Sequence, residues 1–425
     1  MVQMPSGLMF DIPPNPALPA QANSRPDQIS VWRWPGLSAQ AARRLAIVLA
    51  IPMWLLGIVF TRAGIPTDFP VFYTMGALVA AHEPSALYDP AAFADAQRRY
   101  VRAPSFDTRE AFLPVYPPQT PVLMAPLGAL PYGVAGLALA IFSAAAYGWV
   151  VWFTWRAVRH DVPDGRLVAS AALAFAPAWH LLVNQQVTAI LLLACTLGWL
   201  ALERGRPLLA GLAFGVLAVK PQFGLVLAPL ALVRGEWRLI AGAAISCAVQ
   251  LAAALAVLGA DAVRDYVAYV PWIAANADAL EILPLKSHSI RAVTRFLPYG
   301  LSTPAWAIGS IALIAIAIRA WCPEVPLRLR LGLVLLASVL VNPHVIAYDA
   351  VLLVLPMLWI GAAAARAATR DRERWCGAVV VLFASFLGFF TASQSIGLVA
   401  MVVSVLTLVY LFAVSARLAR ITAAV

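Results

Sequence analysis

One carboxylate stands where the first long apolar segment of the chain ends. Asp68 is the first acidic residue after that segment, and Arg62 is the only charged residue between Arg44 and Asp68. Placing a carboxylate beside hydrocarbon costs solvation free energy, so an acid at this position is a candidate for function. It suits a general base that takes the proton of an attacking hydroxyl. The alternatives are a helix cap and a solvated loop acid.

Further polar residues are predicted to lie on the same side of a membrane as Asp68. They are Gln186 in the Asn184–Gln186 turn, Lys220, Lys286, His288, Arg291, and His344 after Asn342 and Pro343, with Asp349 about one turn inside the next span. Lys220, Lys286 and Arg291 suit the anionic phosphate of a lipid-linked substrate, because they offer charge and donors near the headgroups. Each also has a structural alternative: a helix cap for the turn, snorkelling for Lys220, and simple pairing for Asp349.

The sequence shows no pattern typical of a metal or nucleotide site. The five histidines are scattered without ligand spacing, and the four cysteines have no CxxC pair. No glycine-rich phosphate loop is present either. We therefore expect neither a metal nor a cofactor. The formal charge of +10 has no basic, aromatic-interleaved segment behind it, so nucleic acid is not an expected partner.

The composition is that of a membrane protein. The chain has 425 residues, of which 62% are apolar and 12% charged, with a mean hydropathy of +0.82. Apolar runs of spanning length predict an all-α bundle of about 10–12 transmembrane helices. Residues 1–41 form a proline-rich tail that we expect to be disordered and cytoplasmic, and 42–425 form one transmembrane domain.

Segment 207–233 decides the predicted topology. Lys220, Pro221 and Gln222 interrupt its middle, and proline breaks a helix while lysine is costly at mid-bilayer. A pair of short helices that returns to its own side places 20 of the 30 Lys and Arg residues in the cytoplasm, as the positive-inside rule requires. The outer side then receives the long loops 62–130 and 260–300. We expect interfacial helices within them at 71–81, 90–101 and 261–273.

These residues resemble glycosyltransferase family 87. The resemblance covers about residues 45 to 360 and is carried by Asp68 to Tyr73, Tyr116-Pro117-Pro118, Gln186, Lys220-Pro221-Gln222 and Asn342-Pro343-His344. It implies a GT-C fold and inverting, metal-independent transfer from a polyprenyl-phosphate sugar, with Asp68 as the general base. It also places Lys220 and His344 near the site. The predicted pocket comprises Tyr73, Tyr116, Gln186, His288, His344 and Asp349.

The predicted function is therefore transfer of a hexose, mannose first, to the hydroxyl of an extracytoplasmic glycolipid or glycan. The enzyme would be a multi-pass protein of the cell membrane whose active site faces outward. One alternative is an O-antigen-ligase-like or polymerase-like transferase that relies on His288, Arg291 and Arg295. The other is a lipid or solute transporter, which the absence of an internal repeat disfavours.

Overall fold

The computed structural model describes residues 38–63, 68–101, 113–276, 287–298, 300–366, 369–386 and 396–423. Every regular element in these ranges is a helix, which confirms the predicted all-α class. The helices of the main bundle are α1 (Ala39–Ala63), α5 (Tyr132–Val158), α6 (Gly165–Leu173), α7 (Ala176–Val183), α8 (Thr188–Glu203), α9 (Pro207–Gly215), α10 (Leu227–Val233), α11 (Trp237–Ala275), α13 (Arg291–Thr294), α14 (Ser302–Ala320), α15 (Leu327–Val341), α16 (Val354–Arg366), α17 (Thr369–Ser385) and α18 (Ile396–Ala423).

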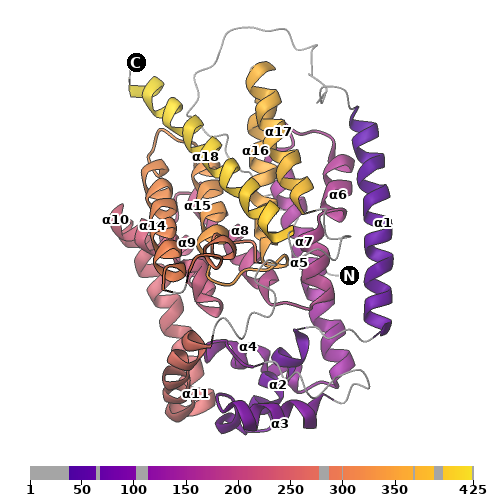
Figure 1. Cartoon of the computed structure of the whole chain (residues 1–425), viewed down its shortest axis with the longest axis vertical. Helices are drawn as coiled ribbons and strands as arrows, with labels where there is room; N and C mark the ends of the chain where they lie inside the picture. Colours follow the sequence, from indigo (N-terminus) through magenta and orange to yellow (C-terminus); the bar gives the residue numbers. More distant parts are fainter. Residues whose placement is uncertain are drawn as a thin grey trace, which may run out of the picture.

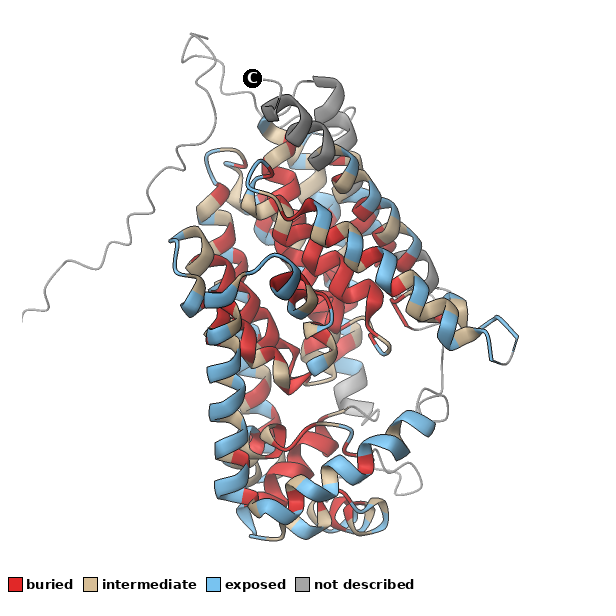
Figure 2. Cartoon of the chain, turned by 90° about the vertical axis from the view of Figure 1, so that its left-hand side faces the viewer, coloured by how far each residue is buried: buried red, intermediate tan, exposed pale blue. Residues whose placement is uncertain are grey.

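Three helices form a smaller group at one end of the molecule. They are α2 (Phe69–Ala80), α3 (Pro90–Tyr100) and α4 (Gln119–Gly128), and they lie beside the C-terminal part of α11 at the bottom of Figure 1. Buried residues occupy both the bundle and this lower group in Figure 2, and they form one large hydrophobic cluster and smaller ones around α2. The predicted helices at 71–81 and 90–101 are thus confirmed as α2 and α3.

Five helical segments of the described chain are long and apolar enough to cross a membrane. They are Ala39–Val59, Tyr132–Val158, Trp237–Ala275, Ser302–Ala320 and Asp349–Arg366. The pair α6 and α7 passes the same test as one broken span bent by 51°, and shorter apolar helices of 10–17 residues accompany them. The structure therefore confirms a polytopic helical membrane protein, while the number of 10–12 crossings stays a prediction.

The lower group is held together by a close helix crossing and an aromatic cluster. A Cβ atom on Gly128 of α4 would lie 2.0 Å from the backbone carbon of Gly76 on α2, so only glycine permits this approach. At its far side, the Tyr88 ring lies 5.1 Å from that of Tyr266 on α11. Helix α11 breaks at Gly259 (φ 83°), where the chain leaves the bundle and turns toward the lower group.

The segment around Lys220 is broken, as its proline suggested. Two short 3₁₀ helices, η2 (Val216–Val219) and η3 (Pro221–Gly224), meet at Lys220, whose backbone is non-helical (φ −132°, ψ 80°). Helix α9 before the break packs closely on α11, since a Cβ on Gly211 would lie 2.0 Å from the carbonyl oxygen of Leu239. The break at Lys220 therefore follows soon after a helix that is packed closely on α11.

The two ends of this broken segment contact neighbouring helix ends, the last turn of α14 and the first turn of α15. Before it, Glu203 accepts from Arg328 at 2.6 Å. After it, Arg234 donates to the carbonyl of Ile318 at 2.7 Å. These contacts support the proposal that 207–233 returns to the side from which it came, which we take to be the cytoplasmic side.

Cysteine labelling tests this topology. In a background with the four native cysteines replaced by alanine, we expect Arg206→Cys and Arg238→Cys to react with an impermeant thiol reagent from the same side. Arg264→Cys, on the exposed C-terminal part of α11, should react only from the opposite side. Labelling of positions 206 and 238 from opposite sides would mean that the segment crosses once and that every later loop changes side.

Candidate active site

Asp68 occupies the N-cap position of α2, but its carboxylate does not cap the helix. The side chain makes no capping hydrogen bond, while Pro70 in the first turn needs none. The carboxylate instead accepts a short hydrogen bond from Nε2 of Gln186, which comes from the main bundle. The capping alternative is therefore excluded, and Asp68 joins the lower group to the bundle.

A tight turn between α7 and α8 carries Gln186 into the interior. Gln185 adopts the left-handed conformation (φ 51°), and its amide donates to the carbonyl of Gly136 at 2.9 Å. The following side chain, Gln186, is completely buried. Its amide nitrogen faces Asp68, and its oxygen accepts from Nζ of Lys220 at 3.3 Å. Gln186 thus bridges a carboxylate and an ammonium group.

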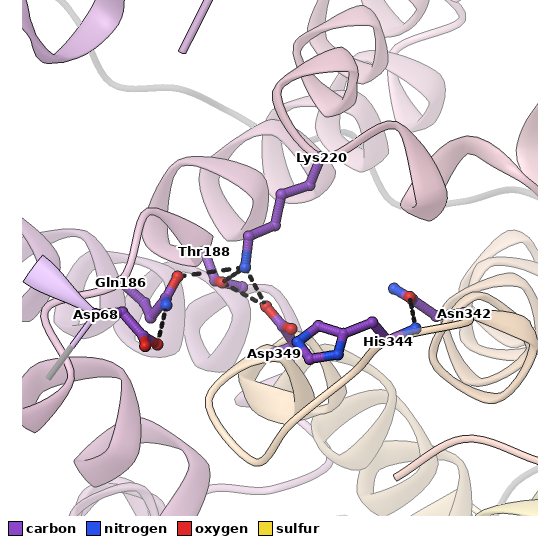
Figure 3. A network of polar contacts seen from close by, with 7 residues as sticks. All are labelled: Asp68, Gln186, Thr188, Lys220, Asn342, His344 and Asp349. Atoms are coloured by element: carbon purple, nitrogen blue, oxygen red, sulfur yellow. Dashed lines mark hydrogen bonds and ion pairs between the residues drawn. The ribbon is translucent and has the colours of Figure 1, made fainter. Parts of the chain in front are cut away.

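The Lys220 ammonium group has an acceptor for each of its three protons. Nζ lies 3.3 Å from Oε1 of Gln186, 3.2 Å from Oγ1 of Thr188 and 2.8 Å from Oδ1 of Asp349. The side chains of Lys220 and Asp349 are only 3% and 2% exposed. Because a charge in a protein interior needs a partner, this ion pair explains how lysine is tolerated here. Figure 3 shows these side chains together with Asp68, Asn342 and His344.

Thr188, at the first position of α8, completes the contacts of Asp349. Its hydroxyl donates to Oδ1 of Asp349 at 2.6 Å and accepts from Lys220. Asp349 begins the 3₁₀ helix η5 (Asp349–Leu353), which leads into α16. Three separate segments of the bundle therefore meet at one buried carboxylate.

Two tyrosines surround the ammonium group. Nζ of Lys220 lies 5.0 Å from the centre of the Tyr348 ring and 5.9 Å from that of Tyr116. Tyr348 also hydrogen bonds to Asp68, and Tyr116 to Gln186. Burial raises the pKa of both hydroxyls well above the ordinary value, and the nearby Asp68 raises it further. Both phenols are therefore neutral at physiological pH.

Solvent reaches three described residues of the site, Asp68, His344 and Tyr116. Asp68 and Tyr116 are half-buried and His344 is exposed, whereas Gln186, Thr188, Lys220 and Asp349 are buried. The buried Asn342 orients the second residue, because its Oδ1 accepts from the backbone N–H of His344 at 2.9 Å. Among the described residues of the site, these three are the ones that a substrate can contact.

Burial raises the pKa of Asp68 above its ordinary value. The hydrogen bond from Gln186, the charge of Lys220, the hydrogen bond from Tyr348 and the charge of His344 all oppose this rise without cancelling it. A carboxylate with a raised pKa is a stronger base than a free one. Asp68 thus combines access, orientation and basicity.

Tyr73, a predicted residue of the pocket, has no described contact with this network. Tyr73 donates its hydroxyl to the carbonyl of Leu130 at 2.8 Å, and its ring packs against Tyr132, so it helps to fix α2 against the start of α5. Tyr73 therefore has a packing role, which its place close to Asp68 in the sequence did not reveal.

The predicted basic loop after residue 280 is only partly described. Lys286 lies outside the described residues. The His288 ring stacks on Phe386 at 5.4 Å, and the guanidinium group of Arg291 lies over the Trp306 ring at 5.4 Å. Binding of a donor phosphate by Lys286, Arg291 and Lys220 stays a prediction.

Two members of the network, Thr188 and Tyr348, were missed at the sequence level. For each of them, the sequence contains one local indication. Thr188 is the second residue after Gln186 at the start of an apolar helix, and Tyr348 directly precedes Asp349. The described residues contain no group of three or more His, Cys, Asp or Glu side chains that could hold a metal ion.

The fold and this site define a polytopic helical membrane protein with an accessible carboxylate backed by a buried polar network. The sequence profile of glycosyltransferase family 87 matches residues 114–343, more than half of the chain. The chain therefore belongs to glycosyltransferase family 87 and is a membrane glycosyltransferase. Comparisons with curated proteins and with solved structures return no match. The matched region includes Gln186 and Lys220, whereas Asp68 and His344 lie outside it.

Proposed function

We propose that this glycosyltransferase moves a hexose, with mannose as the first candidate, from a polyprenyl phosphate to a hydroxyl of an extracytoplasmic glycolipid or glycan. The proposal rests on the exposure, orientation and basicity of the Asp68 carboxylate. It is a half-buried carboxylate directly before α2, oriented by Gln186 and made more basic by burial. Glycosyl transfer to a hydroxyl needs such a base.

In the proposed reaction, Asp68 takes the proton of the acceptor hydroxyl as its oxygen attacks the anomeric carbon of the sugar. The bond from that carbon to the phosphate oxygen breaks, and the polyprenyl phosphate leaves with the bonding electron pair. Attack from the face opposite the leaving group inverts the configuration at this carbon. His344, which is exposed and close enough to influence Asp68, helps to shape the pocket around it.

A donor-exchange assay tests the proposed function. Purified protein in detergent is given membrane lipid extract with radiolabelled polyprenyl-phosphate mannose, polyprenyl-phosphate glucose or the corresponding nucleotide sugars. We expect label to pass to a lipid or glycan from a polyprenyl-phosphate sugar and not from a nucleotide sugar. Transfer from a nucleotide sugar would refute the donor class. Transfer of a preassembled glycan from a polyprenyl diphosphate would favour the ligase-like alternative.

A further inference from the structure

We propose that the buried pair Lys220 and Asp349 positions the catalytic base by fixing which way the Gln186 amide points. The inference rests on the proposed function in one respect only, the role of Asp68 as the base. It assigns Lys220, Asp349 and Gln186 as positioning residues, which act on the reaction through Asp68.

The orientation of the Gln186 amide follows from the hydrogen-bonding groups of an amide and an ammonium group. A glutamine amide has an oxygen that accepts and an NH₂ group that donates, whereas an ammonium group can only donate. Lys220 therefore requires the amide oxygen of Gln186 to face it, at 3.3 Å. The NH₂ group must then face the opposite way, where it donates to the carboxylate of Asp68. Without Lys220, the amide can turn and present its oxygen to the carboxylate.

Asp349 and Thr188 hold Lys220 in the place where it has this effect. Nζ is bound to Oδ1 of Asp349 at 2.8 Å, and the Thr188 hydroxyl bonds to both groups. The side chains of this pair are almost completely buried, so neither ion can leave its partner without losing solvation. The acceptors come from α8 and η5, which the packed bundle keeps in place. The orientation of the Gln186 amide is therefore set by the fold rather than by the substrate.

The position of Asp349 supports a positioning role over direct catalysis. Asp349 is buried, and both of its described donors, Lys220 and Thr188, are buried as well. Between Lys220 and the half-buried Asp68 stands the Gln186 amide, as Figure 3 shows. A chain of three contacts thus links a buried carboxylate to an accessible one.

The predicted consequence is a change in the titration of Asp68. The charged and titratable groups that face it are Lys220, His344, Tyr348 and Tyr116. The donating amide stabilises the ionised carboxylate, whereas a turned amide or a second carboxylate would destabilise it. Loss of the orientation should therefore shift protonation of Asp68 to higher pH and weaken its alignment with the acceptor.

Two variants distinguish control of the Gln186 amide orientation from a simple packing role of Gln186, Lys220 and Asp349. Gln186→Glu keeps the size of the side chain and an acceptor for Lys220, but it removes the donor to Asp68. The double variant Lys220→Met with Asp349→Leu replaces the ion pair by apolar groups of similar size, which a protein interior often tolerates. We expect each to lower kcat on the order of 10²-fold, because the base is misplaced, with a smaller change in KM for the donor.

The experiment measures kcat against pH and, separately, the infrared band of the protonated Asp68 carboxyl, identified by its absence in Asp68→Asn. In Gln186→Glu and in the Lys220→Met, Asp349→Leu variant, we expect the fall of kcat at acidic pH to occur at a higher pH than in the wild-type protein. The infrared band of Asp68 should titrate at a higher pH as well. In a Gln186→Leu background, replacing the pair should remove only the direct effect of the Lys220 charge and so cause a clearly smaller shift than it does with Gln186 present. An unchanged titration, or a full further shift in that background, would overturn the inference.

The two proposals can fail separately. Should the wild-type protein transfer no sugar from any polyprenyl phosphate, the proposed function is wrong, while the infrared titration still decides the orientation of Gln186. Should the paired replacement fail to fold, Gln186→Glu decides, since it retains the ion pair of Lys220 and Asp349. Normal turnover and normal titration in that variant would overturn the inference.

Discussion

Asp68→Asn should lower kcat for sugar transfer by about 10²–10⁴-fold, the range that removal of a general base commonly costs. Asparagine has nearly the size of aspartate, and its oxygen can still accept the hydrogen bond from Gln186. What it loses is the ability to take a proton. Because a base acts only as the transition state forms, binding of the donor should be nearly unchanged. Steady-state kinetics with a direct donor-binding measurement checks both expectations.

The matched control for this variant is Asp261→Asn. Asp261 lies on the C-terminal part of α11, and its carboxylate is 87% exposed in an ion pair with Arg264. Such a pair contributes little to stability, so this variant should keep normal transfer. Near-normal transfer by Asp68→Asn would contradict the general-base role.

The pH dependence of the wild-type enzyme follows from the same group. Burial raises the pKa of Asp68, and only the deprotonated carboxylate can act as the base. The rate should therefore be highest above this raised pKa and should fall as the pH is lowered through it. The fall should begin at a higher pH than for an ordinary aspartate.

Much of the fold could be predicted because hydrophobic length and proline act locally. The apolar runs marked the spanning helices, and Pro221 marked the break beside Lys220. The kink at Gly259 is different. A single glycine in an apolar run does not show that it will adopt φ 83° and turn the chain, since that depends on packing against the lower group.

The residues of the site could be predicted from the sequence better than the contacts between them. Asp68, Gln186 and Asp349 stood out because polar groups beside apolar segments need a reason. The partners of Lys220 could not be predicted, because its ion pair with Asp349 joins residues 129 positions apart. A phosphate and a buried carboxylate satisfy an ammonium group equally well, and sequence alone does not distinguish them.

Gly128→Ala should disable the enzyme from a position that carries no polar group. A Cβ at this position would lie 2.0 Å from the Gly76 carbon and 2.1 Å from the Ala77 nitrogen, both of them backbone atoms that cannot rotate away. Helices α2 and α4 must therefore move apart. Helix α2 is buried from Phe69 to Val79, so it cannot shift without disturbing its other contacts.

Because Asp68 directly precedes α2, this movement displaces the carboxylate from Gln186. We expect transfer to fall on the order of 10²-fold, as misplaced catalytic groups show, and stability to fall by about 1–3 kcal/mol from overpacking. Thermal unfolding and kcat measured on the same preparations check the two effects. Gly133→Ala on α5 is the matched control, since a Cβ there meets no atom within 4 Å. It should leave both quantities unchanged. Wild-type activity in Gly128→Ala would show that the α2–α4 crossing does not position Asp68.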